Sequence, residues 1–111
     1  MRLGIIAQPE AASFSYAKDL GLDFLEFDCN PVSIFGVPTE KVLAKLPECQ
    51  EASARTGIPT AAVGRWGSPV IAKDGSIDPE EWKNVIAIMD FGKALGAKHY
   101  LASAAWVPEL T

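Results

Sequence analysis

One short phrase occurs three times in this sequence, and its spacing constrains the fold more than any other feature. Each copy has a glycine, two linking residues and an apolar run, and each follows a helix-like stretch; the glycines are Gly21, Gly57 and Gly96. They lie 36 and 39 residues apart, a period expected of a strand–loop–helix unit. Glycine suits this place because a left-handed residue ends a helix without a Cβ clash. The repeat therefore predicts alternating helices and strands.

Short, mostly apolar runs predict the strands, at Arg2–Ala7, Asp23–Cys29, Ile58–Val63 and Lys98–Ser103. Strands separated by helices form parallel sheets. We therefore expect an α/β fold with the element order β-α-β-α-β-α-β, in one domain that covers residues 1–111 without a linker.

Helical spacing of apolar residues predicts helices over Ala11–Leu20, Thr39–Thr56 and Asp78–Leu95. Pro47 interrupts the second helix, so we expect a break or a restart there. The third helix begins with a capping-box pattern, in which Asp78 takes the place of Ser or Thr, Pro79 follows, and Glu81 comes three residues after the cap.

Charge and composition favour a cytoplasmic protein in a reducing compartment. A net charge of −4 argues against a nucleic-acid partner, because phosphate binding relies on excess Lys and Arg. No segment approaches the 18 apolar residues of a membrane span, and the first apolar run is too short for a signal peptide. Two cysteines without a C-x-x-C spacing are no disulfide framework.

Ligands of parallel α/β folds bind at the carboxyl ends of the strands. The candidate substrate-binding residues at these ends are Asn30, Arg65, Trp66 and Trp106. Arg65 could hold a phosphate or carboxylate through two parallel hydrogen bonds, and the two indoles would form apolar walls. We expect Arg65 to be partly exposed and to lie on the same rim as Trp66 and Asn30.

Structural roles are the alternative for each of these residues. Arg65 could pair with a helix-end carboxylate, Trp66 could pack under its own loop, and Trp106 could cover the core near the terminus. Asn30 precedes a proline and could simply form a turn.

Other polar residues offer less for catalysis. Glu26 and Asp28 alternate with apolar neighbours, so both should face one side of the sheet and would form a polar layer inside a barrel. His99 lies at the amino end of its strand, away from the rim, and Cys29 has no histidine partner to activate it. Phosphate-binding glycine loops and H-E-x-x-H are absent from the sequence.

Three stretches carry a resemblance to a known family. G-L-D-F-L-E-F at 21–27, V-G-R-W-G at 63–67 and A-L-G-A at 94–97 resemble sugar phosphate isomerases and epimerases of the xylose isomerase-like TIM-barrel superfamily. The resemblance extends over nearly the whole chain, and the V-G-R-W-G loop is its most specific part.

The resemblance implies an eight-stranded (β/α) barrel of about 250 residues, of which this chain would supply the amino-terminal half. In the family, Glu, Asp, His and Glu from later strands hold a divalent metal (Mn or Mg), and two of the glutamates move a proton between adjacent sugar carbons. No metal ligand or catalytic acid carries over to this chain. What carries over is contact with a sugar or sugar phosphate through Asn30, Arg65, Trp66 and Trp106, so we expect the chain to be inactive by itself.

Alternatives of other classes stay open. The family's DNA-repair branch, the endonuclease IV-like enzymes, takes histidine ligands from strand ends that here read Gly64-Arg65-Trp66 and Ser103-Ala104-Ala105. With the net negative charge, the lack of histidine at these ends argues against DNA repair. A non-catalytic module that binds a small molecule or associates with itself is the main alternative, and a flavodoxin-like open sheet is its fold. Strand order separates the two folds: 1-2-3-4 indicates a half-barrel that needs a carboxyl-terminal half or a second copy, and 2-1-3-4 indicates the open sheet.

Overall fold

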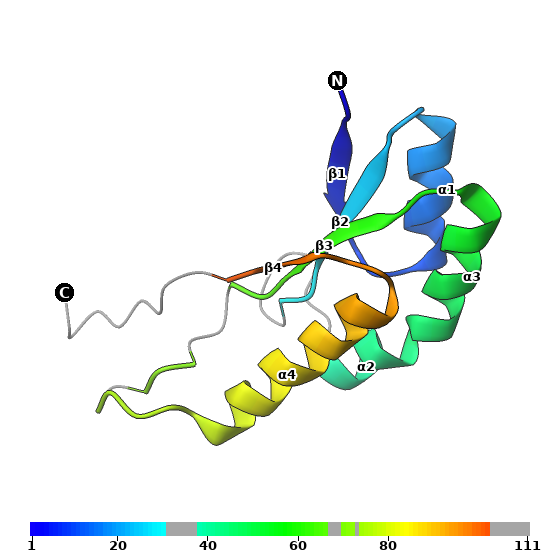
Figure 1. Ribbon diagram of the computed structural model, residues 1–111. Helices are drawn as coiled ribbons and strands as arrows, with labels where there is room; N and C mark the ends of the chain where they lie inside the picture. Colours follow the sequence, from blue (N-terminus) through cyan, green and yellow to red (C-terminus); the bar gives the residue numbers. More distant parts are fainter. Residues whose placement is uncertain (31–37, 67–69, 73, 103–111) are drawn as a thin grey trace.

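Strands and helices alternate along the chain, as the glycine repeat predicts (Figure 1). The computed structural model describes residues 1–30, 38–66, 70–72 and 74–102. Its elements in chain order are β1 (Gly4–Ala7), α1 (Ala11–Asp19), β2 (Phe24–Asp28), α2 (Thr39–Ala44), α3 (Leu46–Thr56), β3 (Thr60–Gly64), α4 (Pro79–Ala94) and β4 (His99–Leu101).

The four strands form one parallel sheet in the order β1-β2-β3-β4. This order confirms the α/β class and is consistent with part of a barrel, whereas the flavodoxin-like order 2-1-3-4 is wrong. Register is regular except between Leu25 and Glu26, where the pairing with β3 shifts past Ala61. Ile6, Glu26, Ala62 and His99 consequently form one row across the sheet.

Each strand differs from its predicted bounds at one end or both. β1 begins at Gly4 instead of Arg2, and β3 begins at Thr60 instead of Ile58. Apolar residues just before these starts, Leu3 and Ile58, extended the predictions beyond the paired strands. The predicted end of the last strand, Ser103, lies outside the described residues.

Helix ends follow the local sequence signals. Pro47 lies in the first turn of α3, which restarts the helix one residue after α2, so the predicted break is confirmed. Gly57 ends α3 in the left-handed region with a φ of 75°, a conformation that strains residues with a Cβ. Asp78 caps α4 by accepting hydrogen bonds from the backbone N–H groups of Glu80 and Glu81 at 2.9 and 3.2 Å.

A single core lies between the helices and one face of the sheet. Leu25, Phe27 and Val63 point into it from the strands and meet buried residues of all four helices; Phe14 of α1 packs edge-on against Phe27 with ring centroids 5.6 Å apart. Successive strand residues point to opposite faces. The row that contains Ile6 and His99 therefore lies on the face without helices, which we call the open face.

Close packing of α4 on β3 uses a helical glycine. A Cβ added at Gly92 would lie 2.7 Å from Cγ2 of Val63, closer than real Cβ atoms approach, so only glycine lets the helix come this near. This contact holds the last turn of α4 against β3. Within the described residues, no helix has the length and apolar character needed to cross a membrane.

Candidate functional site at the strand ends

The carboxyl ends of β2, β3 and β4 meet at one level of the sheet. Asp28, Gly64 and Leu101 are register partners. The ladder continues one step further, because the N–H of Cys29 donates to the Gly64 carbonyl at 2.8 Å and the N–H of Arg65 donates to the Leu101 carbonyl at 3.0 Å. The residues that follow β2 and β3 are thus held side by side.

Arg65 forms a buried, two-pronged ion pair with Glu81 in the first turn of α4. Its Nε and Nη2 donate to the two carboxylate oxygens at 2.6 and 2.8 Å, and its Nη1 donates to the Cys29 carbonyl at 3.0 Å. The side chains of Arg65 and Glu81 are only 2% and 9% exposed. The Glu81 hydrogen bonds raise the pKa of Arg65 above its usual value, so the guanidinium stays charged.

The exposure predicted for Arg65 is wrong. A guanidinium that faced solvent would be free for an anionic ligand, but here the two donors that could grip a phosphate are used by Glu81. The alternative role, pairing with a carboxylate at a helix end, is the one that the structure shows. A contact of Arg65 with substrate stays a prediction.

Glu81 was assigned from the sequence to a capping box, in which its carboxylate would return to the N–H of Asp78. That half of the motif is wrong: the Asp78 N–H donates to the Val70 carbonyl at 2.8 Å, and the Glu81 carboxylate serves Arg65 and, at 3.3 Å, Asn84. The signal that could have identified it was an arginine at a strand end followed by an acidic first helical turn.

Asn30 is buried and joins the ends of β2 and β3. Its Oδ1 accepts the backbone N–H of Trp66 at 2.6 Å. Its Nδ2 and its backbone N–H both donate to Oδ1 of Asp28, at 2.6 and 3.0 Å. The turn predicted at Asn30 and Pro31 extends outside the described residues. The bond to Trp66 joins loops 36 residues apart.

Trp66 lies over Gly64, and its side is set by the strand. Val63 faces α4, so Gly64 faces the open side, and a Cβ on Gly64 would overlap the six-membered ring of the indole. The indole therefore covers Gly64 on the open face, with 39% of the residue exposed. The structure brings together Asn30, Arg65 and Trp66 at one rim, and Trp106 lies outside the described residues.

The other polar residues considered in the sequence, Glu26, His99 and Cys29, lie on the open face or in the core. Glu26 and His99 lie in one row of the open face with Ala62 between them. Cys29 is fully buried, and burial, followed by the nearby Asp28, raises its pKa to about 12. In the part of the chain that the structure describes, His, Cys, Asp and Glu side chains form no group of three that could hold a metal ion.

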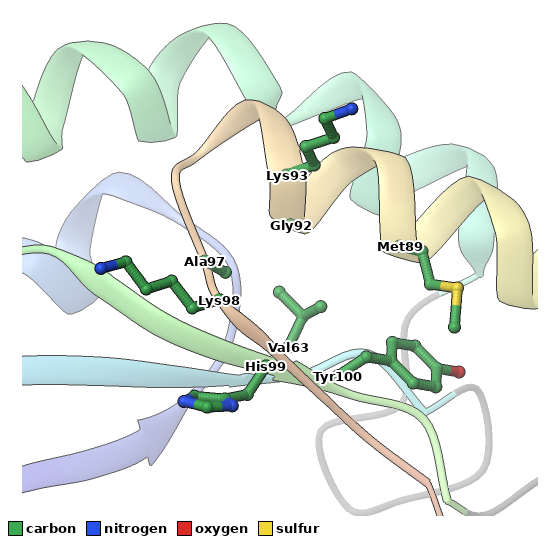
Figure 2. A pocket seen from close by; sticks show the side chains of 8 residues that line it. All are labelled: Val63, Met89, Gly92, Lys93, Ala97, Lys98, His99 and Tyr100. Atoms are coloured by element: carbon green, nitrogen blue, oxygen red, sulfur yellow. The ribbon is translucent and has the colours of Figure 1, made fainter.

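A pocket lies away from this rim, between α4 and the first part of β4 (Figure 2). Val63 and Tyr100 face α4 there, while His99 points away from the helix. The Tyr100 hydroxyl is buried and has no hydrogen-bond partner among the described residues, and burial raises the pKa of Tyr100. The pocket marks the side of β4 that has no further strand among the described residues.

Comparison with known proteins gives a likeness of fold. The chain is similar to the crystal structure of 3-keto-D-glucoside 4-epimerase, YcjR, from E. coli in its apo form, with a TM-score of 0.69 and 20% sequence identity. The match covers 100% of this chain and 43% of that one, so the chain spans less than half the length of the epimerase. No family model matches the sequence, and no curated protein matches it.

Proposed function

We propose that this chain is the amino-terminal half of a sugar isomerase or epimerase barrel and that its strand-end rim contacts the sugar. The observation that carries the proposal is the exposed indole of Trp66, held on the open face at the carboxyl ends of the strands. Ligand sites of parallel α/β folds lie at these ends. The structural likeness to a sugar epimerase supports the choice of ligand class.

The electrostatics of the rim favour a neutral sugar over a sugar phosphate. Arg65 carries the positive charge closest to Trp66 in the sequence, and its two parallel donors are taken up by Glu81. A phosphate would have to displace that carboxylate from a buried site. Among the described rim residues, Trp66 offers an exposed indole to a sugar, whereas Asn30 is only 1% exposed and its amide is hydrogen-bonded to Asp28 and Trp66.

The described residues do not fit the divalent metal (Mn or Mg) that the family resemblance implies. No group of three His, Cys, Asp or Glu side chains lies together in the described ranges. We therefore derive no catalytic step from this chain. Metal ligands and proton-transferring acids would belong to a second half, from the rest of a longer polypeptide or from another chain.

Binding of a neutral ketose tests this proposal. The purified chain with Trp106→Phe, which removes the other indole predicted at the rim, is titrated with D-fructose and D-fructose 6-phosphate while tryptophan fluorescence is followed. Trp82→Phe is the matched control, because Trp82 is an exposed indole on α4. We expect D-fructose to change the emission of the chain and of Trp82→Phe but not of Trp66→Phe, with little response to the phosphate. A response that survives in Trp66→Phe would contradict the proposed site.

We also expect the chain by itself to show no turnover of these sugars with added Mn²⁺ or Mg²⁺.

The alternative is a non-catalytic module. It predicts that the chain binds a small molecule or associates with itself, and that no carboxyl-terminal half-barrel is needed. The order of the strands opposes its flavodoxin-like form, and a half-barrel that only binds or self-associates stays possible. Metal-dependent epimerisation after the addition of a carboxyl-terminal half would decide for the enzyme.

A further inference from the structure

One hydrogen-bonded network joins three elements, β2, β3 and α4, at the rim. We call it the rim network; it consists of the side chains of Asp28, Asn30, Arg65 and Glu81 with the backbone of Cys29 and Trp66. These residues lie at the end of β2 and just after it, just after β3, and in the first turn of α4. All six residues of the network lie in the described part of the chain.

Two consecutive residues are tethered from opposite sides. Arg65 is held on the helix side by Glu81 and by the Cys29 carbonyl. Trp66 is held through its backbone N–H, which donates to Asn30 at 2.6 Å. With both positions fixed, the Trp66 side chain returns over Gly64, where the missing Cβ leaves room for the ring.

We propose that Glu81 and Asn30 are positioning residues that hold the Trp66 indole as a fixed apolar platform on the open face. The statement that a sugar ring is what rests on this platform depends on the function proposed above. The positioning itself does not.

The negative charge of Glu81 neutralises Arg65 within the rim network. Sequence analysis missed this role. A buried guanidinium without a carboxylate partner is strongly unfavourable, so Arg65 would leave its place when Glu81 is neutralised. The rim side is accessible to solvent, since Trp66 is 39% exposed there, whereas Glu81 of α4 covers the guanidinium on the helix side. An Arg65 that moved there would release the Cys29 carbonyl and disturb the adjacent Trp66.

Fluorescence of Trp66 alone tests this inference. The background is Trp82→Phe with Trp106→Phe, which leaves Trp66 as the single tryptophan of the three. Glu81→Gln keeps the shape and removes the charge, and Glu80→Gln is the matched control, since Glu80 is 83% exposed one residue earlier. We expect Glu81→Gln to raise acrylamide quenching of Trp66 about twofold and to lower its anisotropy, as for a side chain that has gained motion. Glu80→Gln should change neither.

Two further variants keep the test decisive. Arg65→Lys keeps the charge but cannot form the two-pronged pair, and it should reproduce the effect even if Glu81→Gln fails to fold. Asn30→Ala should loosen Trp66 with the ion pair intact. Unchanged quenching and anisotropy in folded Glu81→Gln or Arg65→Lys would overturn the inference.

The sugar is tested separately in the same background. If Glu81→Gln loosens Trp66 and D-fructose leaves Trp66 emission unchanged, the positioning stands and the sugar-binding function fails. If D-fructose shifts the emission equally in the background and in Glu81→Gln with no change in quenching, the function stands and the positioning fails.

Discussion

At the scale of single residues, Arg65 and Glu81 show how a rim can be charged and yet closed to anions. Both are almost fully buried, and each satisfies the other through two short hydrogen bonds. Such a pair adds little net stability compared with apolar residues of the same volume, but removal of one partner leaves a buried charge. The pair therefore has a clear signature in stability measurements.

We predict that Glu81→Ala lowers the free energy of unfolding by about 3–5 kcal/mol, because Arg65 loses its buried partner. The double variant Arg65→Met with Glu81→Met should recover most of that loss, since no charge is left in the site. Urea denaturation of the three proteins at pH 7 measures both effects. A double variant no more stable than Glu81→Ala would show that the loss does not come from an unpaired buried charge.

We predict that Cys29 and Cys49 react very slowly with a thiol reagent in the native protein. Burial, as the largest cause, raises the pKa of each thiol to about 12, so at pH 8 the native thiolate is roughly a thousandfold rarer than in an unfolded chain. The measurement is labelling by a disulfide reagent with and without urea. Labelling of the native protein at the unfolded rate would contradict the burial of both residues.

The same shifts have a consequence for stability at high pH. A thiol whose pKa is raised on folding favours the protonated state, so its contribution is fully present below the usual thiol pKa of 9.0 and is lost as the pH rises toward about 12. The folded state should therefore weaken over this alkaline range.

At the residue scale, the sequence predicted where the rim residues lie better than it predicted their hydrogen-bond partners. Asn30, Arg65 and Trp66 were assigned to one rim because the carboxyl ends of parallel strands share a level, and this depends only on topology. The partner of Arg65 depends on how α4 packs on β3, which rests on the contact of Gly92 with Val63. That contact joins residues 29 positions apart, and no local pattern marks it.

At the scale of elements, helices in this chain are tied to one another by side chains at their ends. The N-terminus of α1 has no capping side chain of its own. Glu48 of α3 supplies one instead: its Oε2 accepts the N–H of Ala11 at 2.9 Å, which lowers the pKa of Glu48. A carboxylate at this place also suits the positive end of the α1 dipole.

We predict that Glu48→Gln lowers the free energy of unfolding by about 0.5–1 kcal/mol at pH 7, a modest amount because the carboxylate is partly exposed. Since folding lowers the pKa of Glu48, its contribution is present above the usual value of 4.5 and is lost as the pH falls through the lower folded value. Urea denaturation at pH 7 and pH 3 should show a difference in the free energy of unfolding that is smaller at pH 3. Glu51→Gln, at an exposed site on the same helix, is the control, and an equal effect of both would contradict the cap.

Element order, helix stops and the break at Pro47 were predictable because each has a local cause, such as a glycine in the left-handed region or a proline in a first turn. Strand ends were not predictable from local sequence, because a strand ends where its backbone pairing with the neighbouring strand ends. The register shift near Leu25 arises because β3 has one more residue than β2 between two paired positions. Neither strand's sequence shows this without the other.

At the scale of the whole molecule, the sheet has one covered face and one open face. Ile6, Trp66 and Leu101 are 54%, 39% and 39% exposed, and the described residues give β1 and β4 a strand partner on one side only. Unpaired edges and apolar surface favour association. At about 25 cal/mol per Å², covering about 400 Å² of apolar surface is worth about 10 kcal/mol, which is as large as the stability of a small domain.

The central claim is that this chain is a half-barrel whose open face and strand edges are completed by a second half or a second copy. Sedimentation equilibrium of the purified chain over a wide range of concentrations tests it most directly, with Ile6→Lys as a variant that places a charge on the open face. The account predicts a mass that rises with concentration for the chain and a weaker rise for Ile6→Lys. A monodisperse monomer at high concentration that unfolds cooperatively would contradict it, because the open face would then be stable without a partner.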